Sequence, residues 1–303
     1  LDDLKGRFFA PVGYIDPFDS ETAVEYDDRH IFMQRALAYV DKTANIFNET
    51  KVLRFNYRTL SSDVMQDIND NISSVIVDEL GLVKATAIEG KDTNNDQQGE
   101  EADNLNGFKE HTDQAEKELI AAFFATAKVA LPNVCAYNQL QTLAWQLLGS
   151  ASARMVYDFS AQPTVVASIV REQHANVNLQ SPLQISFEYT DGMGKVAMKK
   201  VQAESGIVKL PNGTEINTEN KLRWIGNGRT VLNNKGNPIK QYEPYFSTTP
   251  AYEADPMLVE QGVSPILYYD GAGRNVRTEL PNGTFTKVVF DAWKQLTYDV
   301  NDT

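Results

Sequence analysis

The chain has 303 residues, of which 42% are hydrophobic and 10% aromatic, enough to fill the core of one large domain or two ordinary ones. Its net charge of −13 argues against nucleic acid and an anionic membrane as partners, because a phosphate surface attracts clustered Lys and Arg residues and the chain has no such cluster. A single cysteine, Cys135, excludes a disulfide within the chain and a cysteine-based metal site, and no run reaches the length of about 20 apolar residues that a membrane span needs.

Residues 1–90 are predicted to form successive antiparallel strands. Short alternating runs such as TAVEY (22–26) and KVLRFNY (51–57) are separated by clusters of Asp, Asn, Gly and Pro. Alternation with a period of two places one face of a strand in the core and the other in solvent, and the clusters favour turns. The sequence therefore predicts a β region here.

Residues 91–149 are predicted to form an acidic loop followed by a helical hairpin that is inserted into the β protein. The loop is almost free of large apolar side chains. Asp113 with Glu116 three residues later fits a helix start, and the apolar residues that follow keep helical spacing until Pro132. A second helical stretch ends at Gly149, a residue type suited to a helix C-terminus.

Residues 150–303 return to strands and contain an internal repeat. The run FEYTDGMGKVAMKKV (187–201) matches LYYDGAGRNVRTEL (267–280), and the pentapeptide LPNGT accompanies both, at 210–214 and 280–284. Each copy has aromatic residues, then Asp-Gly-x-Gly with a basic residue, then an alternating strand. Self-similarity of this kind is typical of repeat architectures.

The repeating unit is interpreted as a strand end followed by a turn. The aromatic residue packs on its neighbours in the sheet, the aspartate accepts hydrogen bonds from the turn, and glycine supplies a position of positive φ. We predict that these residues are structural, with no catalytic, cofactor-binding or metal-binding role. The predicted turn residues are Asp191, Gly194, Lys195, Asp270, Gly273, Arg274, Asn282 and Gly283.

These motifs resemble the YD repeats of Rhs proteins, in particular those of the B component of bacterial insecticidal toxin complexes, the Tc toxins. The most specific stretch is RWIGNGRTVLNNKGNPIKQYEPYFS (223–247), followed by residues 262–303. The resemblance implies a mainly β fold, in which an antiparallel YD-repeat sheet forms a segment of a spiral, hollow shell. The regions 1–90, 91–149 and 150–303 would then be one continuous unit, and we expect the chain to be a piece of a longer protein.

The function implied by the resemblance is structural. Such a shell encloses and protects a toxic C-terminal polypeptide before delivery, so the expected partners are the C component or C-terminal cargo and the translocation-pore component. We expect a non-catalytic, secreted protein, with a cytoplasmic stage before export left open. Exposed strand edges would favour self-association.

Two alternative functions are weighed beside the shell. Trp145, Trp224 and Trp293 would suit a carbohydrate or cell-surface binding module if they formed a platform, although tryptophans in a repeat sheet are more often packed in the core. A glycoside hydrolase would need two paired carboxylates, which spacing cannot reveal in an acidic chain.

Three motifs that suggest chemistry have simpler interpretations. Gly271 and Gly273 lack the third glycine of a dinucleotide loop and precede a strand, which argues against a nucleotide site. The loop from Asp92 to Asp103 has oxygen ligands at the first calcium-loop positions but lacks the glycine at the sixth, so weak calcium binding is left open. The histidines, His30, His111 and His174, show no metal-site or triad spacing.

Overall fold

The computed structural model describes residues 5–130, 133–192, 194–219, 221–262 and 264–303. The chain divides into two compact units. The first unit consists of Leu1–Glu118, Ala144–Met155 and Ile169–Leu183, and the second consists of Leu119–Leu143, Val156–Ser168 and Gln184–Thr303. Pro132, predicted to end the first helical run, lies outside the described residues.

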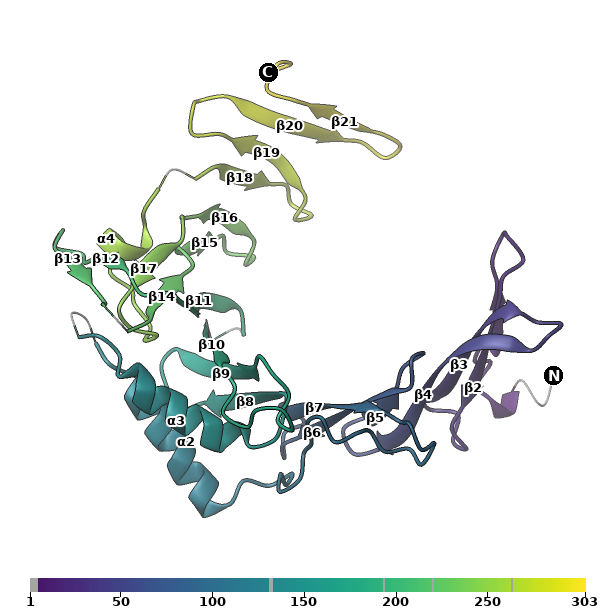
Figure 1. The fold of residues 1–303 in the computed structure, drawn as a ribbon. Coiled ribbons are helices and arrows are strands. Elements are labelled where there is room, and N and C mark those ends of the chain that lie inside the picture. The colour runs from purple at the N-terminus through teal and green to yellow at the C-terminus, as the bar shows by residue number, and fades with distance from the viewer. Residues whose placement is uncertain (1–4, 131–132, 193, 220, 263) are drawn as a thin grey trace. The chain divides into compact units, whose positions relative to one another are not determined.

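The first unit is an antiparallel sheet in which the strands are hydrogen-bonded in chain order (Figure 1). Its strands are β1 (Gly13–Ile15), β2 (Glu21–Tyr26), β3 (Met33–Asp41), β4 (Ile46–Asn56), β5 (Ser61–Gln66), β6 (Asn71–Val77) and β7 (Val83–Lys91). The last of these, β7, pairs with the start of β8 (Ala153–Asp158), where Ala85 lies opposite Arg154. Strands β1 to β7 thus lie in the stretch where alternation predicts a β region.

The second unit contains strands of three antiparallel sheets. One sheet has the order β9 (Thr164–Arg171), β10 (Leu183–Thr190), β11 (Val196–Ala203), β14 (Arg223–Gly226) and β17 (Tyr245–Ser247), and another pairs β12 (Ile207–Lys209) with β13 (Glu215–Asn217). The C-terminal sheet has the order β15 (Thr230–Leu232), β16 (Pro238–Gln241), β18 (Ile266–Tyr269), β19 (Asn275–Glu279), β20 (Phe285–Phe290) and β21 (Gln295–Tyr298) (Figure 1). Residues of β8 and β9 occur in both units.

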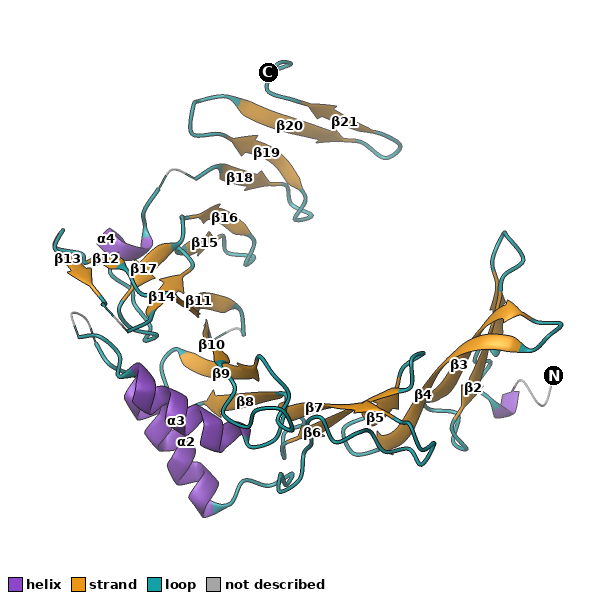
Figure 2. Cartoon of the chain, in the orientation of Figure 1, coloured by secondary structure: helices purple, strands orange, loops and turns teal. Residues whose placement is uncertain are grey.

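Two helices, α2 (Gln114–Ala127) and α3 (Tyr137–Leu148), stand in the sequence between β7 and β8, and a short helix, α4 (Pro256–Val259), precedes β18 (Figure 2). The carboxylate of Asp113 accepts a hydrogen bond from the backbone N–H of Glu116 at 2.8 Å, as an N-cap does, and Gly149 follows α3 with φ +54°. The helical hairpin predicted within a β protein is confirmed. No helix in the described part of the chain is long and apolar enough to cross a membrane.

A buried ion cluster joins the start of α2 to the sheet of the first unit. Arg154, of which only 2% is exposed, donates to the carbonyl of Lys84 at 3.0 Å and pairs with Glu116. Glu116 also accepts from the Lys84 ammonium at 2.8 Å. The two cations share the Glu116 carboxylate and each also donates to a backbone carbonyl, so hydrogen bonds compensate for their burial.

An aromatic core organises the second unit. Phe123 stacks on Phe187 with ring centres 5.7 Å apart, and Phe187 meets Trp224 edge-on at 5.6 Å. All three side chains are fully buried. A sugar-binding platform that includes Trp224 is therefore wrong, because its ring is packed inside the protein.

The two copies of LPNGT occupy different places in the fold. The first copy joins β12 to β13, which form a separate two-stranded hairpin. In the sequence this hairpin stands between β11 and β14, and those two strands pair with each other. The second copy joins β19 to β20 within the C-terminal sheet. Residues 196–209 separate the first copy from the turn at 191–195, against residues 275–279 in the second copy, and the longer stretch includes the first strand of the β12–β13 hairpin.

Candidate functional site

The predicted turn residues lie in a five-residue turn that recurs along the chain. In each copy the first residue donates its N–H to the carbonyl of the fifth and accepts at its own carbonyl from the N–H of the fourth, and the fourth residue has positive φ. This pattern matches a type I turn followed by a bulge residue in the left-handed region. Eight copies occur among the described residues, beginning at Asp16, Asp67, Asp78, Asp191, Leu210, Asn233, Asp270 and Leu280.

The turn that begins at Asp270 is closed by its own carboxylate. Oδ1 of Asp270 accepts from the N–H groups of Ala272 and Arg274, both at 2.9 Å, and Oδ2 accepts from Nε of Arg274 at 2.7 Å. The backbone hydrogen bond from Arg274 lowers the pKa of Asp270, so the carboxylate stays ionised and keeps accepting at neutral pH. Gly273, with φ +84°, is the fourth residue.

The other predicted residues also close their turns, from the first position at Asp191 and from the third position at Asn282. Asp191 accepts from the N–H of Lys195 at 2.9 Å, and Gly194 has φ +75°. In the second LPNGT, Oδ1 of Asn282 accepts from the N–H of Thr284 at 3.1 Å, and Gly283 has φ +85°. The side-chain oxygens of these residues accept hydrogen bonds within the turns, and the glycines provide the positions of positive φ.

Lysine side chains connect different turns, a feature that the sequence reasoning missed. The Lys195 ammonium donates to the carbonyl of Gly236 in the turn that begins at Asn233, and the Lys235 ammonium donates to the carbonyl of Gly271 in the turn that begins at Asp270. The hydroxyl of Tyr269 adds a bond to the carbonyl of Pro238 at 2.8 Å. Lys195 and Lys235 thus each contact another turn, whereas Arg274 pairs with Asp270 of its own turn.

A buried polar cluster around Glu253 was also missed, because its members are far apart in sequence. Glu253 pairs with the fully buried Lys200 and accepts from the hydroxyls of Tyr245 at 2.9 Å and Ser247 at 2.8 Å. Burial lowers the pKa of Lys200 to about 8 and raises the pKa of Tyr245. A lysine with a lowered pKa can act as a nucleophile, but Lys200 is enclosed by the protein. The cluster therefore connects the loop that carries Glu253 to strands β11 and β17.

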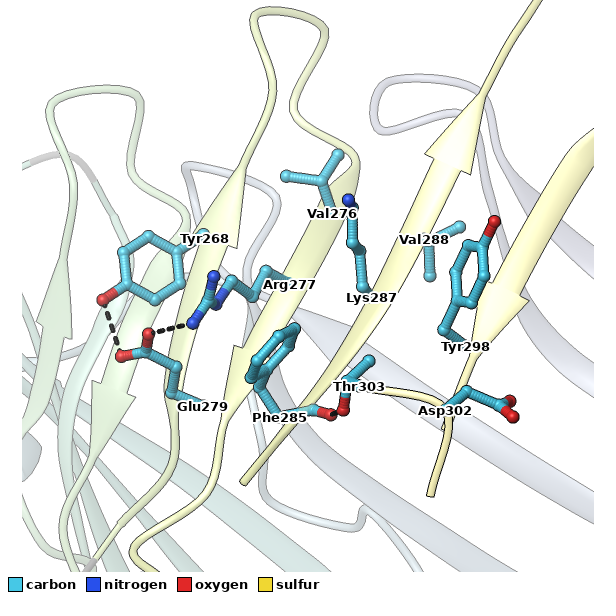
Figure 3. A pocket seen from close by; sticks show the side chains of 10 residues that line it. All are labelled: Tyr268, Val276, Arg277, Glu279, Phe285, Lys287, Val288, Tyr298, Asp302 and Thr303. Carbon is cyan, nitrogen blue, oxygen red and sulfur yellow. Dashed lines mark hydrogen bonds and ion pairs between the residues drawn. The ribbon is translucent and has the colours of Figure 1, made fainter. Parts of the chain in front are cut away.

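The C-terminal sheet has a concave face that encloses a recess with a volume of about 730 Å³ (Figure 3). Glu279 accepts from the hydroxyl of Tyr268 at 2.9 Å and pairs with Arg277 at 2.7 Å, and the guanidinium of Arg277 stacks 3.8 Å from the centre of the Phe285 ring. The hydrogen bond to Glu279 raises the pKa of Tyr268. Aromatic rings with paired charges suit binding of a polar partner. The face is lined by Tyr268, Val276, Arg277, Glu279, Phe285, Lys287, Val288, Tyr298, Asp302 and Thr303.

The acidic loop folds on itself. Asp92 accepts from the N–H groups of Asp96 and Gln97, each at 3.0 Å, whereas Asp103 is buried and accepts from the N–H of Ala175 at 2.6 Å. The two ends of this loop, for which weak calcium binding was left open, thus accept from backbone donors. Within the described ranges, no group of three or more His, Cys, Asp or Glu residues is arranged to hold a metal ion.

His174 and Ser152 meet at the same carboxylate. Nδ1 of His174 lies 2.9 Å from Oδ2 of Asp103, and the hydroxyl of Ser152 donates to that oxygen at 2.5 Å. In a catalytic triad the serine bonds the histidine, which removes its proton. Here the serine bonds the carboxylate directly, so this contact does not activate it as a nucleophile.

Comparisons with known proteins identify a fold. No known family matches the sequence, and no curated protein matches it. Among solved structures, TcdB2-TccC3 is 20% identical with a TM-score of 0.58, and a form without its hypervariable C-terminal region is 16% identical with a TM-score of 0.57. The Tc holotoxin pore of Photorhabdus luminescens is 15% identical with a TM-score of 0.54.

Each of these similarities covers 93% of this chain but only 12–15% of the other. The chain is thus similar in fold to a small part of those Tc toxin chains. The mainly β, antiparallel fold class predicted from the sequence is confirmed.

Proposed function

We propose that the chain is a non-catalytic wall segment of a toxin-complex shell built from YD repeats of the Rhs type. In this role it encloses and protects a toxic C-terminal polypeptide before delivery, within a secreted virulence complex. Its partners would be the C component or C-terminal cargo and the translocation-pore component. The rest of the shell would be supplied by further segments of a longer protein.

The observation that carries this proposal is the recurrence of one turn along antiparallel sheets in which most neighbouring strands are consecutive in the chain, in a fold shared with Tc toxin chains. A repeat that contacts its neighbours through turn-to-turn bonds builds an extended wall, because each added hairpin covers the edge of the last. The candidate catalytic groups support the same role. Lys200 is enclosed, and Ser152 bonds a carboxylate.

Protease protection tests this function. In the full-length protein that contains this segment, the C-terminal polypeptide should resist a protease that degrades the same polypeptide when it is produced alone. Gly273→Val should open the wall and abolish protection, whereas Gly271→Val, at a position with ordinary φ and no atom within 4 Å of an added Cβ, should retain it. Equal cleavage of enclosed and free polypeptide would refute enclosure.

A carbohydrate-binding role is the second candidate, favoured by the concave aromatic face of the C-terminal sheet (Figure 3). Glycan-array binding by the chain should then be lost in Tyr298→Ala and kept in Trp293→Ala, since Trp293 does not line this face. Absence of binding to all glycans would remove this candidate. It would leave the shell proposal untouched.

A further inference from the structure

A second recess, in the first unit, carries an inference that is separate from the shell. Its volume is about 650 Å³, and strands β4 to β7 and the loop of residues 97–110 line it. Four carboxylates but only one guanidinium are among the lining residues. The carboxylates are those of Asp63, Glu89, Glu101 and Glu110, and the guanidinium is that of Arg54. Glu110 also pairs at 3.2 Å with Arg58, which does not line the recess, so Glu89 and Glu101 are the acids of the rim that carry surplus charge.

Two buried polar atoms in this recess have no hydrogen-bond partner among the described residues. They are the hydroxyl of Ser74, a residue that is only 6% exposed, and Oδ1 of Asp63. Oδ2 of Asp63 faces Nε of Arg54 at 3.6 Å, beyond a strong hydrogen bond. A buried polar atom without a partner costs free energy, so binding of a molecule that supplies hydrogen-bond donors here would be favourable.

Burial raises the pKa of Asp63, which means that its charged form is incompletely compensated by the neighbouring groups. A cation placed next to Oδ1 would favour the ionised carboxylate. The rim of the recess is also conformationally strained, since Gln97 and Glu101 adopt φ of +65° and +54°. Strained residues of this kind cluster at ligand clamps.

We propose that this recess binds an organic cation through its primary ammonium groups. An ammonium has three donors and no acceptor, which matches the carboxylate of Asp63, the hydroxyl of Ser74 and the surplus acids of the rim. The carboxylates are not grouped in threes around a point, which disfavours a single metal ion among the described residues and favours an extended cation. A free polyamine and a lysine side chain share this chemistry.

Calorimetry on the whole chain with two probes, spermidine and trilysine, tests the proposal. We expect at least one probe to bind when the ionic strength is held constant. Asp63→Asn should weaken it about tenfold, as loss of one charge-assisted hydrogen bond does, and Glu101→Gln should weaken it less because this side chain is exposed. Preference for spermidine would indicate a free polyamine, and preference for trilysine a peptide.

Glu215→Gln provides the matched control, since it removes one exposed carboxylate from β13, in the other unit. It should bind the probes as the wild type does. Two results would overturn the proposal: no heat with either probe at millimolar concentration, or equal affinity in Asp63→Asn, Glu101→Gln and Glu215→Gln. Glu101→Gln keeps the test valid if Asp63→Asn fails to fold.

Discussion

Replacing Gly273 by alanine should lower the free energy of unfolding by about 1–2 kcal/mol, the usual cost of a left-handed backbone for an L-residue. Gly273 has φ +84°, and an added Cβ would have Nδ2 of Asn237 as its nearest neighbour at 3.5 Å, an ordinary contact. The cost therefore comes from the backbone conformation and not from a collision. Valine, branched at Cβ, should cost more.

Gly271, two residues earlier in the same turn, is the control. It has ordinary φ and no atom within 4 Å of an added Cβ, so Gly271→Ala should leave stability unchanged or raise it by up to about 1 kcal/mol through the unfolded state. Urea unfolding of both variants with equal m values measures the difference. Equal destabilisation by Gly271→Ala and Gly273→Ala, or a neutral Gly273→Ala, would refute the turn interpretation.

Three further predictions concern the interior of the second unit. Lys200→Met should destabilise the protein by about 3–5 kcal/mol in urea unfolding, because it leaves Glu253 buried without its cation, and adding Glu253→Gln should recover part of the loss. The pKa of Lys200 is about 8 in the folded state against 10.5 for a free lysine, so between these pH values the unfolded chain binds more protons and the melting temperature should rise from pH 8 toward 10. Above pH 10 the melting temperature should fall, because the raised pKa of Tyr245 keeps that tyrosine neutral only in the folded state. A melting temperature that does not change with pH would contradict this prediction. Phe187→Ala should lower the free energy of unfolding by about 3–5 kcal/mol, since the ring of Phe187 packs between those of Phe123 and Trp224. A loss below about 1 kcal/mol would contradict this prediction, because it would mean that the surrounding side chains fill the space of the ring.

The sequence was most informative where structure is local. Asp-Gly-x-Gly followed by a basic residue predicts a turn because every interaction that shapes it lies within five residues. The same pattern does not predict the copies at Asp16 and Asp67, since their fourth residues are Asp19 and Asp70 and not glycine. Aspartate tolerates positive φ better than most residues, so a search for Asp-x-x-Asp as well as Asp-x-x-Gly would have found them.

The interior clusters could not be predicted because nothing local specifies them. Lys200 and Glu253 are separated by 53 residues, and neither belongs to a motif. Their contact depends on the pairing of β11 with β14 and of β14 with β17, which places Tyr245 and Ser247 beside them. Trp224 was assigned to a surface platform in one alternative for the same reason: alternation says which residues share a face of a strand, but not which face is covered.

The lysine bonds between turns explain how a repeat with small individual hairpins becomes a stable sheet. An isolated two-stranded hairpin is marginal in water, so the strands β18 and β19 need neighbours. Lys235 ties their turn to the preceding one, and Lys195 ties that turn to the one between β10 and β11. At Gly236 the contact requires glycine, because an added Cβ would lie 2.0 Å from the Lys195 ammonium, whereas an added Cβ at Gly271 has no atom within 4 Å. At Gly236 the absence of a side chain therefore leaves room for the lysine that connects one turn to another.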